Sequence, residues 1–459
     1  MFMQSPILKR TVSLGLTIMM ILSLISACRT STVLPGDVVT DPELNREIRQ
    51  VTGIKRNTVL DEEIMATLEK LDTTHKKYSY IRDLKGLEYA VNLRELNLSY
   101  NYFIEDLSPL RKLTSLEKLV FIENKISDLT PLAGLTQLVH LEISSAEIEN
   151  IHPLAGMSSL QTLILFNNRI TDISALAGLD NLKELNLWQN EISDLSPIGS
   201  SASLVKANLS SNKIVDISPL SGAVSMQTLE LFRNDISDIS VLAELESLKE
   251  LDLDNNRISD LSPLGRSSSL EKVNLSSNTI RDLSPLSTAV HLQKLELFRN
   301  DISDISPLSD LKSLKRLGLS GNRISDLTPL AGLSELVDLE LSSNLITDVD
   351  PLRTLTRLRQ LALWENQIHD ITPLSGLLEV EHLNLGRNRI DTISPLLTLS
   401  SLKTISLSGN NITDFSVLLS LPNLVKAYIG DNPFDPEDPT FRTVIRKLER
   451  AGVEVIKEH

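Results

Sequence analysis

Asparagine recurs in this chain every 22 residues, which makes the chain an array of repeats. Of fifteen positions on this grid between residues 124 and 432, fourteen are asparagine, and the exception is Ala146. The asparagines are Asn124, Asn168, Asn190, Asn212, Asn234, Asn256, Asn278, Asn300, Asn322, Asn344, Asn366, Asn388, Asn410 and Asn432. Asn101 precedes the series one residue out of phase. A fixed period constrains the fold more than local propensity does, because each repeat must pack against copies of itself.

Each repeat carries the same spaced leucines ahead of its asparagine, as in Leu185-x-Leu187-x-x-Asn190. The two leucines point to one side of an extended segment, so the pattern predicts a short strand with one buried face. One repeat cannot bury its leucines alone, but a stack of repeats forms a continuous parallel sheet and core. The asparagine closes the following turn, where its amide can bond backbone groups that no strand partner satisfies.

A second constant element follows the asparagine, as in Asp194-Leu-Ser196-Pro197. Aspartate and serine ahead of a proline suit the cap and first position of a short helical turn. Because every repeat carries these polar residues, we interpret both the asparagines and the aspartates as structural.

The repeated text resembles the leucine-rich repeat family, and within it the bacterial internalins. The resemblance rests on strings such as Ile-Ser-Asp-Leu-Ser-Pro-Leu at 258–264 and Ile-Ser-Asp-Leu-Thr-Pro-Leu at 324–330, and on a cap that begins Asp41-Pro42-Glu43-Leu44. It implies an α/β solenoid: a right-handed leucine-rich repeat horseshoe of about 16 coils with a 22-residue period. A concave parallel sheet, short 3₁₀ turns on the convex side and a helical N-terminal cap complete the implied fold, with ligand recognition on the concave face.

The chain is expected to divide into five segments. They are a lipoprotein signal peptide at 1–27, a lipidated cysteine and tether at 28–40, a helical cap with a degenerate first repeat at 41–92, the repeats at 93–432, and a C-terminal cap at 433–459. No immunoglobulin-like domain, sortase signal or wall-binding module follows the repeats, so the expectation is a surface-displayed binder.

The N-terminus predicts export and lipidation. Lys9 and Arg10 precede an apolar run from 12 to 25 that ends Ile25-Ser-Ala-Cys28. The run is short for a membrane-spanning helix and suits a signal peptide. Cys28 is the single cysteine, so it can form no internal disulfide. It resembles the lipobox cysteine of bacterial lipoproteins, which implies a lipid-anchored protein outside the cytoplasm; the alternative is a free thiol.

Composition narrows the class of partner. The formal net charge is −15, which disfavours nucleic acid and favours a soluble monomer that binds basic partners. The seven histidines show no metal-ligand spacing, and no nucleophile or phosphate-binding motif occurs. We therefore expect a protein that is not an enzyme and that has no metal or cofactor.

The residues that face outward from the strands are the candidate ligand contacts, because the repeat frame leaves them free to vary. In one coil these are Glu184, Asn186 and Trp188. Large aromatic residues occupy the third of these positions in five coils: Phe166, Trp188, Phe232, Phe298 and Trp364. Four of the five are 66 residues apart, and residues 229–240 and 295–306 are identical. The aromatics are read either as binding anchors or as products of a three-repeat duplication.

Carboxylates lie beside these aromatics in the expected sheet. They are Glu230, Asp252, Asp254, Glu296 and Glu340. Stacked strands would bring them together as an acidic stripe that binds cationic groups, and the alternative is a solvated surface. The function we expect is protein recognition by the concave face, as an adhesin, receptor or scaffold. A glycan-binding module that uses Trp188 and Trp364 as stacking platforms is the alternative.

Overall fold

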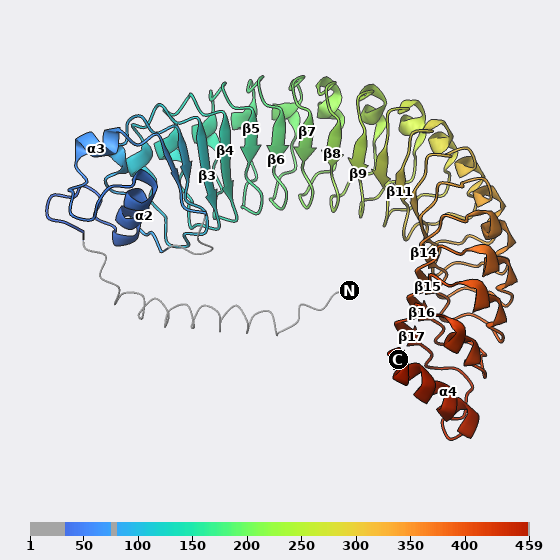
Figure 1. Ribbon diagram of the computed structural model, residues 1–459. Coiled ribbons are helices and arrows are strands. Elements are labelled where there is room, and N and C mark those ends of the chain that lie inside the picture. The colour runs from blue at the N-terminus through green and yellow to red at the C-terminus, as the bar shows by residue number, and fades with distance from the viewer. Residues whose placement is uncertain (1–32, 75–79, 458–459) are drawn as a thin grey trace. The chain divides into compact units, whose positions relative to one another are not determined.

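The computed structural model describes residues 33–74 and 80–457 (Figure 1). The expected signal peptide and Cys28 therefore lie outside the described residues. The chain divides into two compact units, Met1–Ile148 and Glu149–His459. The boundary falls two residues after Ala146, in the coil that lacks the grid asparagine.

The N-terminal unit begins with the helical cap expected from the sequence. Helix α2 spans Pro42–Thr52, and the Asp41 carboxylate accepts hydrogen bonds from the backbone N–H groups of Glu43 and Leu44. Helix α3 spans Glu62–Ala66. A buried ion pair between Arg49 and Asp37, 3.0 Å long, ties α2 to the segment before it.

Short parallel strands follow the cap in this unit. They are β1 (Lys70–Asp72), β2 (Glu95–Asn97), β3 (Lys118–Ile122) and β4 (His140–Ser144), and each pairs with the next. The 3₁₀ turns between them are η1 (Leu87–Tyr89), η2 (Ser108–Leu110) and η3 (Thr130–Leu132). Strand β1 was not expected, because its residues lie in the predicted cap.

The second unit repeats this coil from β5 to β17 and adds a final strand and helix. Its strands are β5 (Thr162–Ile164), β6 (Glu184–Asn186), β7 (Lys206–Asn208), β8 (Thr228–Glu230), β9 (Glu250–Asp252), β10 (Lys272–Asn274), β11 (Lys294–Glu296), β12 (Arg316–Gly318), β13 (Asp338–Glu340), β14 (Gln360–Ala362), β15 (His382–Asn384), β16 (Thr404–Ser406), β17 (Lys426–Tyr428) and β18 (Glu454–Ile456). Consecutive strands pair in parallel, and from β5 to β17 the partners are 22 residues apart. The strands line the inner side of this curved unit and the 3₁₀ turns lie outside (Figure 1).

The 3₁₀ turns of the second unit alternate with its strands. They are η4 (His152–Leu154), η5 (Ser174–Leu176), η6 (Ser196–Ile198), η7 (Ser218–Gly222), η8 (Ser240–Glu244), η9 (Ser262–Arg266), η10 (Ser284–Thr288), η11 (Ser306–Leu308), η12 (Thr328–Leu330), η13 (Asp350–Thr354), η14 (Thr372–Gly376), η15 (Ser394–Thr398) and η16 (Ser416–Ser420). Helix α4 (Pro439–Arg450) covers the end, where the rings of Phe434 and Phe441 stack 4.4 Å apart. The leucine-rich repeat solenoid with a helical N-terminal cap is thus confirmed.

The grid asparagines form the ladder that their spacing predicts. The amide nitrogen of Asn278 donates to the carbonyl oxygens of Leu253, Leu275 and Ser276, at 3.0, 3.1 and 2.9 Å. Its amide oxygen accepts from the backbone N–H of Ile258 at 2.9 Å. From Asn190 to Asn432, each grid asparagine joins its own turn to the preceding coil in this way, which satisfies buried backbone groups that the strands leave unpaired.

A left-handed residue precedes every grid asparagine. Gln189 has φ of 58° and Ser277 has φ of 54°, and glycine occupies the equivalent position at Gly321 and Gly409. Side chains tolerate this conformation at some cost, so the ladder bonds of the following asparagine stabilise a turn that most residues avoid.

The repeated aspartate lies one residue before the helical N-cap, and not at the cap itself. Leu195 is the N-cap of η6, while Asp194 accepts the backbone N–H of Ser196 at 2.8 Å. Hydrogen bonds from the side chain and backbone of Ser196 hold the pKa of Asp194 below its usual value. The aspartate is structural, as expected, but it acts through an Asx turn.

Among the described residues, no helix is long and apolar enough to cross a membrane.

Candidate functional site

The outward face of the sheet in the second unit is here called the concave face. In β6 and the two residues after it, the side chains of Leu185 and Leu187 are fully buried, whereas Glu184, Asn186 and Trp188 are partly exposed. The period-2 pattern of the strand produces this division, because alternate side chains leave opposite faces. The same positions on every coil therefore form one continuous surface.

The five aromatic residues lie on the concave face, and all are partly buried. Phe166 and Trp188 contact each other, with ring centroids 5.8 Å apart and planes tilted by 40°. The indole nitrogen of Trp188 is buried and has no hydrogen-bond partner among the described residues.

Two of the aromatic rings contact residues of the next coil. The guanidinium of Arg387 lies 5.0 Å from the centre of the Trp364 ring. The Phe298 ring lies over Gly318, so closely that a Cβ there would come within 2.3 Å of it. Both rings nevertheless remain partly exposed, as Phe232 does.

The two identical segments 229–240 and 295–306 lie in different surroundings. Glu296 is 4% exposed and accepts a hydrogen bond from Arg316 Nε at 2.6 Å, with Lys294 Nζ at 3.4 Å. Arg316 also pairs with Asp338 and, at 3.1 Å, with Glu340. Strand β12 thus encloses Glu296 in the second copy, segment 295–306, because it places Arg316 and Gly318 beside β11.

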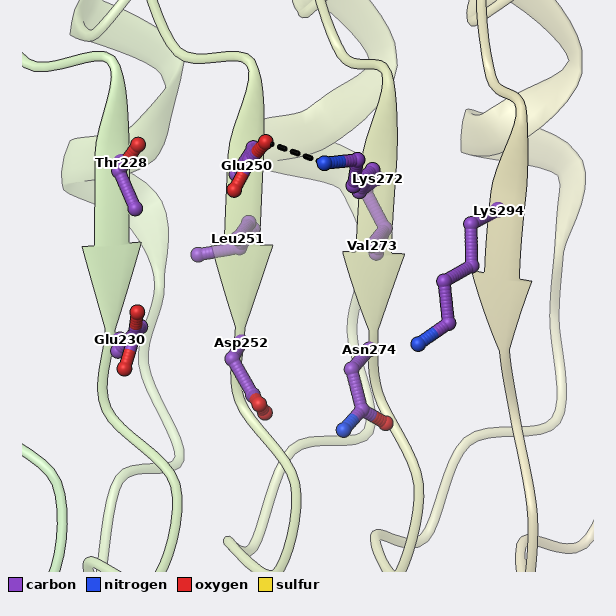
Figure 2. Close-up of a pocket in the computed structure, with 9 residues that line it drawn as sticks. All are labelled: Thr228, Glu230, Glu250, Leu251, Asp252, Lys272, Val273, Asn274 and Lys294. Carbon is purple, nitrogen blue, oxygen red and sulfur yellow. Dashed lines mark hydrogen bonds and ion pairs between the residues drawn. The ribbon is translucent and has the colours of Figure 1, made fainter.

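The first copy, segment 229–240, has no arginine on the next strand to enclose its glutamate, Glu230. Glu230 accepts a hydrogen bond from Asn208 at 2.5 Å, and the next strand places Glu250 and Asp252 beside it. Figure 2 shows Glu230 and Asp252 on the lower part of the same surface, below the ion pair of Glu250 with Lys272, whose atoms are 2.7 Å apart. Together these groups line a shallow depression of about 180 Å³, here called the acidic depression.

Burial raises the pKa of two carboxyl groups in the acidic depression, Glu230 and Asp252. For Glu230 burial is the main cause, and the neighbouring carboxylates Asp252 and Glu250 raise it further, against Lys206. For Asp252 burial again dominates, and Asp254 adds to the rise, against hydrogen bonds that include one from Asn274. A cation that approached these groups would relieve unfavourable charge burial.

The expected acidic stripe is therefore interrupted. Glu230, Asp252 and Asp254 lie on neighbouring strands as predicted, whereas Arg316 separates them from Glu340 and neutralises Glu296. The sequence pattern did not identify Arg316 as a residue of this surface. A signal was present, since Lys272, Lys294 and Arg316 occupy the same outward position in three consecutive coils.

The raised folded-state pKa values of Glu230 and Asp252 mean that the folded protein favours the protonated form of both groups. Their contribution to folding stability is therefore fully present below the unfolded-state pKa values, near pH 4, and is lost as the pH rises through the folded-state values. The double variant Glu230→Gln, Asp252→Asn is expected to be more stable than the wild type at pH 7. Urea unfolding at several pH values should show this difference vanish near pH 4. A constant difference would contradict the pKa assignment.

No group of three or more histidine, cysteine, aspartate or glutamate side chains among the described residues has the geometry of a metal site. What the concave face offers is instead a row of varied charged, aromatic and amide groups on a rigid scaffold.

The fold defines the class of protein: a solenoid of short strands and 3₁₀ turns. The chain belongs to the leucine-rich repeat family, since a model described as two copies of leucine-rich repeats matches residues 91–133, 158–200, 246–288, 290–332, 334–376 and 378–420, more than half of its length. Members of this family are typically binding scaffolds and not enzymes. A sequence search of curated proteins finds no match.

Solved structures agree on this fold. An internalin of Listeria monocytogenes is 28% identical with a TM-score of 0.53, and the match covers 87% of this chain and 98% of the internalin. A leucine-rich repeat protein of Leptospira interrogans is 24% identical with a TM-score of 0.72, covering 86% and 97%. The Arabidopsis receptor kinase HAESA, solved with a peptide hormone and a co-receptor, is 23% identical with a TM-score of 0.64, covering 80% and 66%.

Proposed function

We propose that this protein is displayed outside the cytoplasm and recognises a protein partner through the concave face of its second unit. The observation that carries the proposal is the acidic depression, where Glu230 and Asp252 are partly buried and form no ion pair with a described lysine or arginine, although Lys272 and Lys294 also line it. Leucine-rich repeat proteins generally mediate protein recognition, and the related HAESA structure holds a peptide hormone. A basic partner segment is the chemistry that fits this surface.

We further propose that Cys28 carries the membrane anchor. The support is the sequence Ile-Ser-Ala-Cys after a positively charged and then apolar N-terminus, together with the absence of any other cysteine. Two or more acyl chains on this residue would hold the protein stably at a membrane. Segment 29–40 would then serve as a tether for the solenoid.

The first and second copies of the duplicated segment provide a matched test of recognition. Phe232→Ala is expected to weaken partner binding by about 1 to 2 kcal/mol, whereas Phe298→Ala should change it by less than about 0.5 kcal/mol. The reason is that Glu296 beside Phe298 is enclosed by Arg316, whereas Glu230 beside Phe232 lines the acidic depression. The measurement is calorimetric titration of the captured partner.

Both variants must first show wild-type circular dichroism, which separates binding from folding. Equal losses of affinity, or a larger loss for Phe298→Ala, would contradict the assignment of the first copy as the contact surface.

A further inference from the structure

A second depression lies on the concave face between β13 and β17, and it differs in chemistry from the acidic depression. Its volume is about 220 Å³. The small side chains of Ala362 and Ser406 leave room at its floor, Asp338 lines one end and Tyr428 the other. It is called the amide depression below, after Gln360 and Asn384, which line it between these ends.

Three polar side chains in the amide depression are unengaged. The side chains of Gln360, His382 and Thr404 make no hydrogen bond to any described residue, although all three line the depression. The amide oxygen of Asn384 accepts the backbone N–H of Gly386 at 3.2 Å, which leaves its amide nitrogen as a free donor. Such a row of donors and acceptors on adjacent strands is suited to a ligand that has many hydroxyl groups.

One buried acceptor also lacks a partner. Asp338 is 8% exposed and pairs with Arg316 through one carboxylate oxygen, while its other oxygen has no hydrogen-bond partner among the described residues. An unsatisfied buried acceptor is costly, so a donor from a bound molecule would stabilise it.

The charge balance favours a neutral ligand over a cationic one. The two carboxylates of this depression, Asp338 and Glu340, already share Arg316. A lysine or arginine from a partner would compete with that guanidinium, whereas a hydroxyl group could add a hydrogen bond and leave the pair intact. The Tyr428 ring bounds this depression and carries the Lys426 ammonium 5.1 Å from its centre, so the neutral hydrogen-bonding groups of the floor are what a ligand would contact.

We infer that the amide depression binds a neutral saccharide, with Asn384, Gln360 and Thr404 as hydrogen-bonding residues. This site is separate from the acidic depression, and the inference does not depend on the proposed protein partner.

The test uses the full-length protein and immobilised tetrasaccharides of glucose, galactose, mannose and N-acetylglucosamine, followed by calorimetric titration of the tightest probe. Asn384→Ala and Thr404→Val are each expected to weaken binding about three- to tenfold. The chain supplies matched controls in Asn186→Ala and Thr162→Val. These residues hold the same repeat positions, and Asn186 accepts the equivalent backbone bond, from Trp188 at 3.1 Å.

The controls should bind within about twofold of the wild type, and all four variants should keep the wild-type melting temperature. Retention of none of the four probes at millimolar concentration would overturn the inference, as would equal weakening in the control variants. A tetralysine probe that binds in their place and responds to Asn384→Ala would assign the site to a basic peptide instead. Binding of a protein partner that depends on Phe232 would be unaffected by either result.

Discussion

Replacing Asn278 with alanine is expected to lower the free energy of unfolding by about 1 to 3 kcal/mol. The substitution removes the amide that donates to the carbonyls of Leu253, Leu275 and Ser276, and it strips the N–H of Ile258 of its acceptor. All of these groups lie inside the solenoid, where water cannot replace the lost bonds. Urea unfolding followed by circular dichroism measures the effect.

Asn274 provides the control for this experiment, because it is the same residue type in the same coil but faces outward. Its side chain accepts the Ser276 N–H at 3.2 Å and hydrogen-bonds Asp252 on the partly exposed face of the sheet, where water can replace these bonds. Asn274→Ala should therefore cost less than about 0.5 kcal/mol. Asn432, in the last repeat, is less buried, and its replacement should cost less than that of Asn278. Equal effects at 274 and 278 would show that the ladder is not the stabilising element.

Cys28→Ser is expected to release the protein from the membrane fraction or to leave it unprocessed. The apolar run 12–25 is too short to hold the chain by itself once lipidation is prevented. Membrane fractionation and labelling with radioactive palmitate are the measurements. Adding Ser31→Cys to this variant restores a thiol three residues away and should not restore the anchor, since the lipobox defines the position. A Cys28→Ser protein that stays membrane-bound and labelled would contradict the proposal.

Much of the fold was predictable because one pattern is repeated many times. The period placed Asn278 and its equivalents in a ladder, and Asp41 before Pro42 marked the start of α2 correctly. Both are local relations between neighbours in sequence or in adjacent coils. The left-handed residue before each asparagine was not predicted, because only Gly321 and Gly409 signal it by residue type.

The concave face was less predictable, since its properties depend on which residues three or four strands bring together. Glu230 and Glu296 occupy identical sequence segments, yet one lines an open depression and the other is enclosed by Arg316. Their difference comes from the strands that follow, which present Glu250 and Asp252 in one case and Arg316 and Gly318 in the other. Identity of sequence within a repeat therefore does not establish identity of environment.

Site-specific photo-crosslinking tests most directly the claim that the concave face is the recognition surface. The photoreactive residue p-benzoylphenylalanine is placed in separate variants at Phe232 on the concave face and at Val224, an exposed residue that follows η7. Cells that display each variant are irradiated, and covalent adducts are identified by mass spectrometry. The account predicts a protein adduct from position 232 that a Glu230→Gln, Asp252→Asn background diminishes, and none from position 224. An adduct from position 224 alone, or one from position 232 that is unaffected by the charge substitutions, would contradict it.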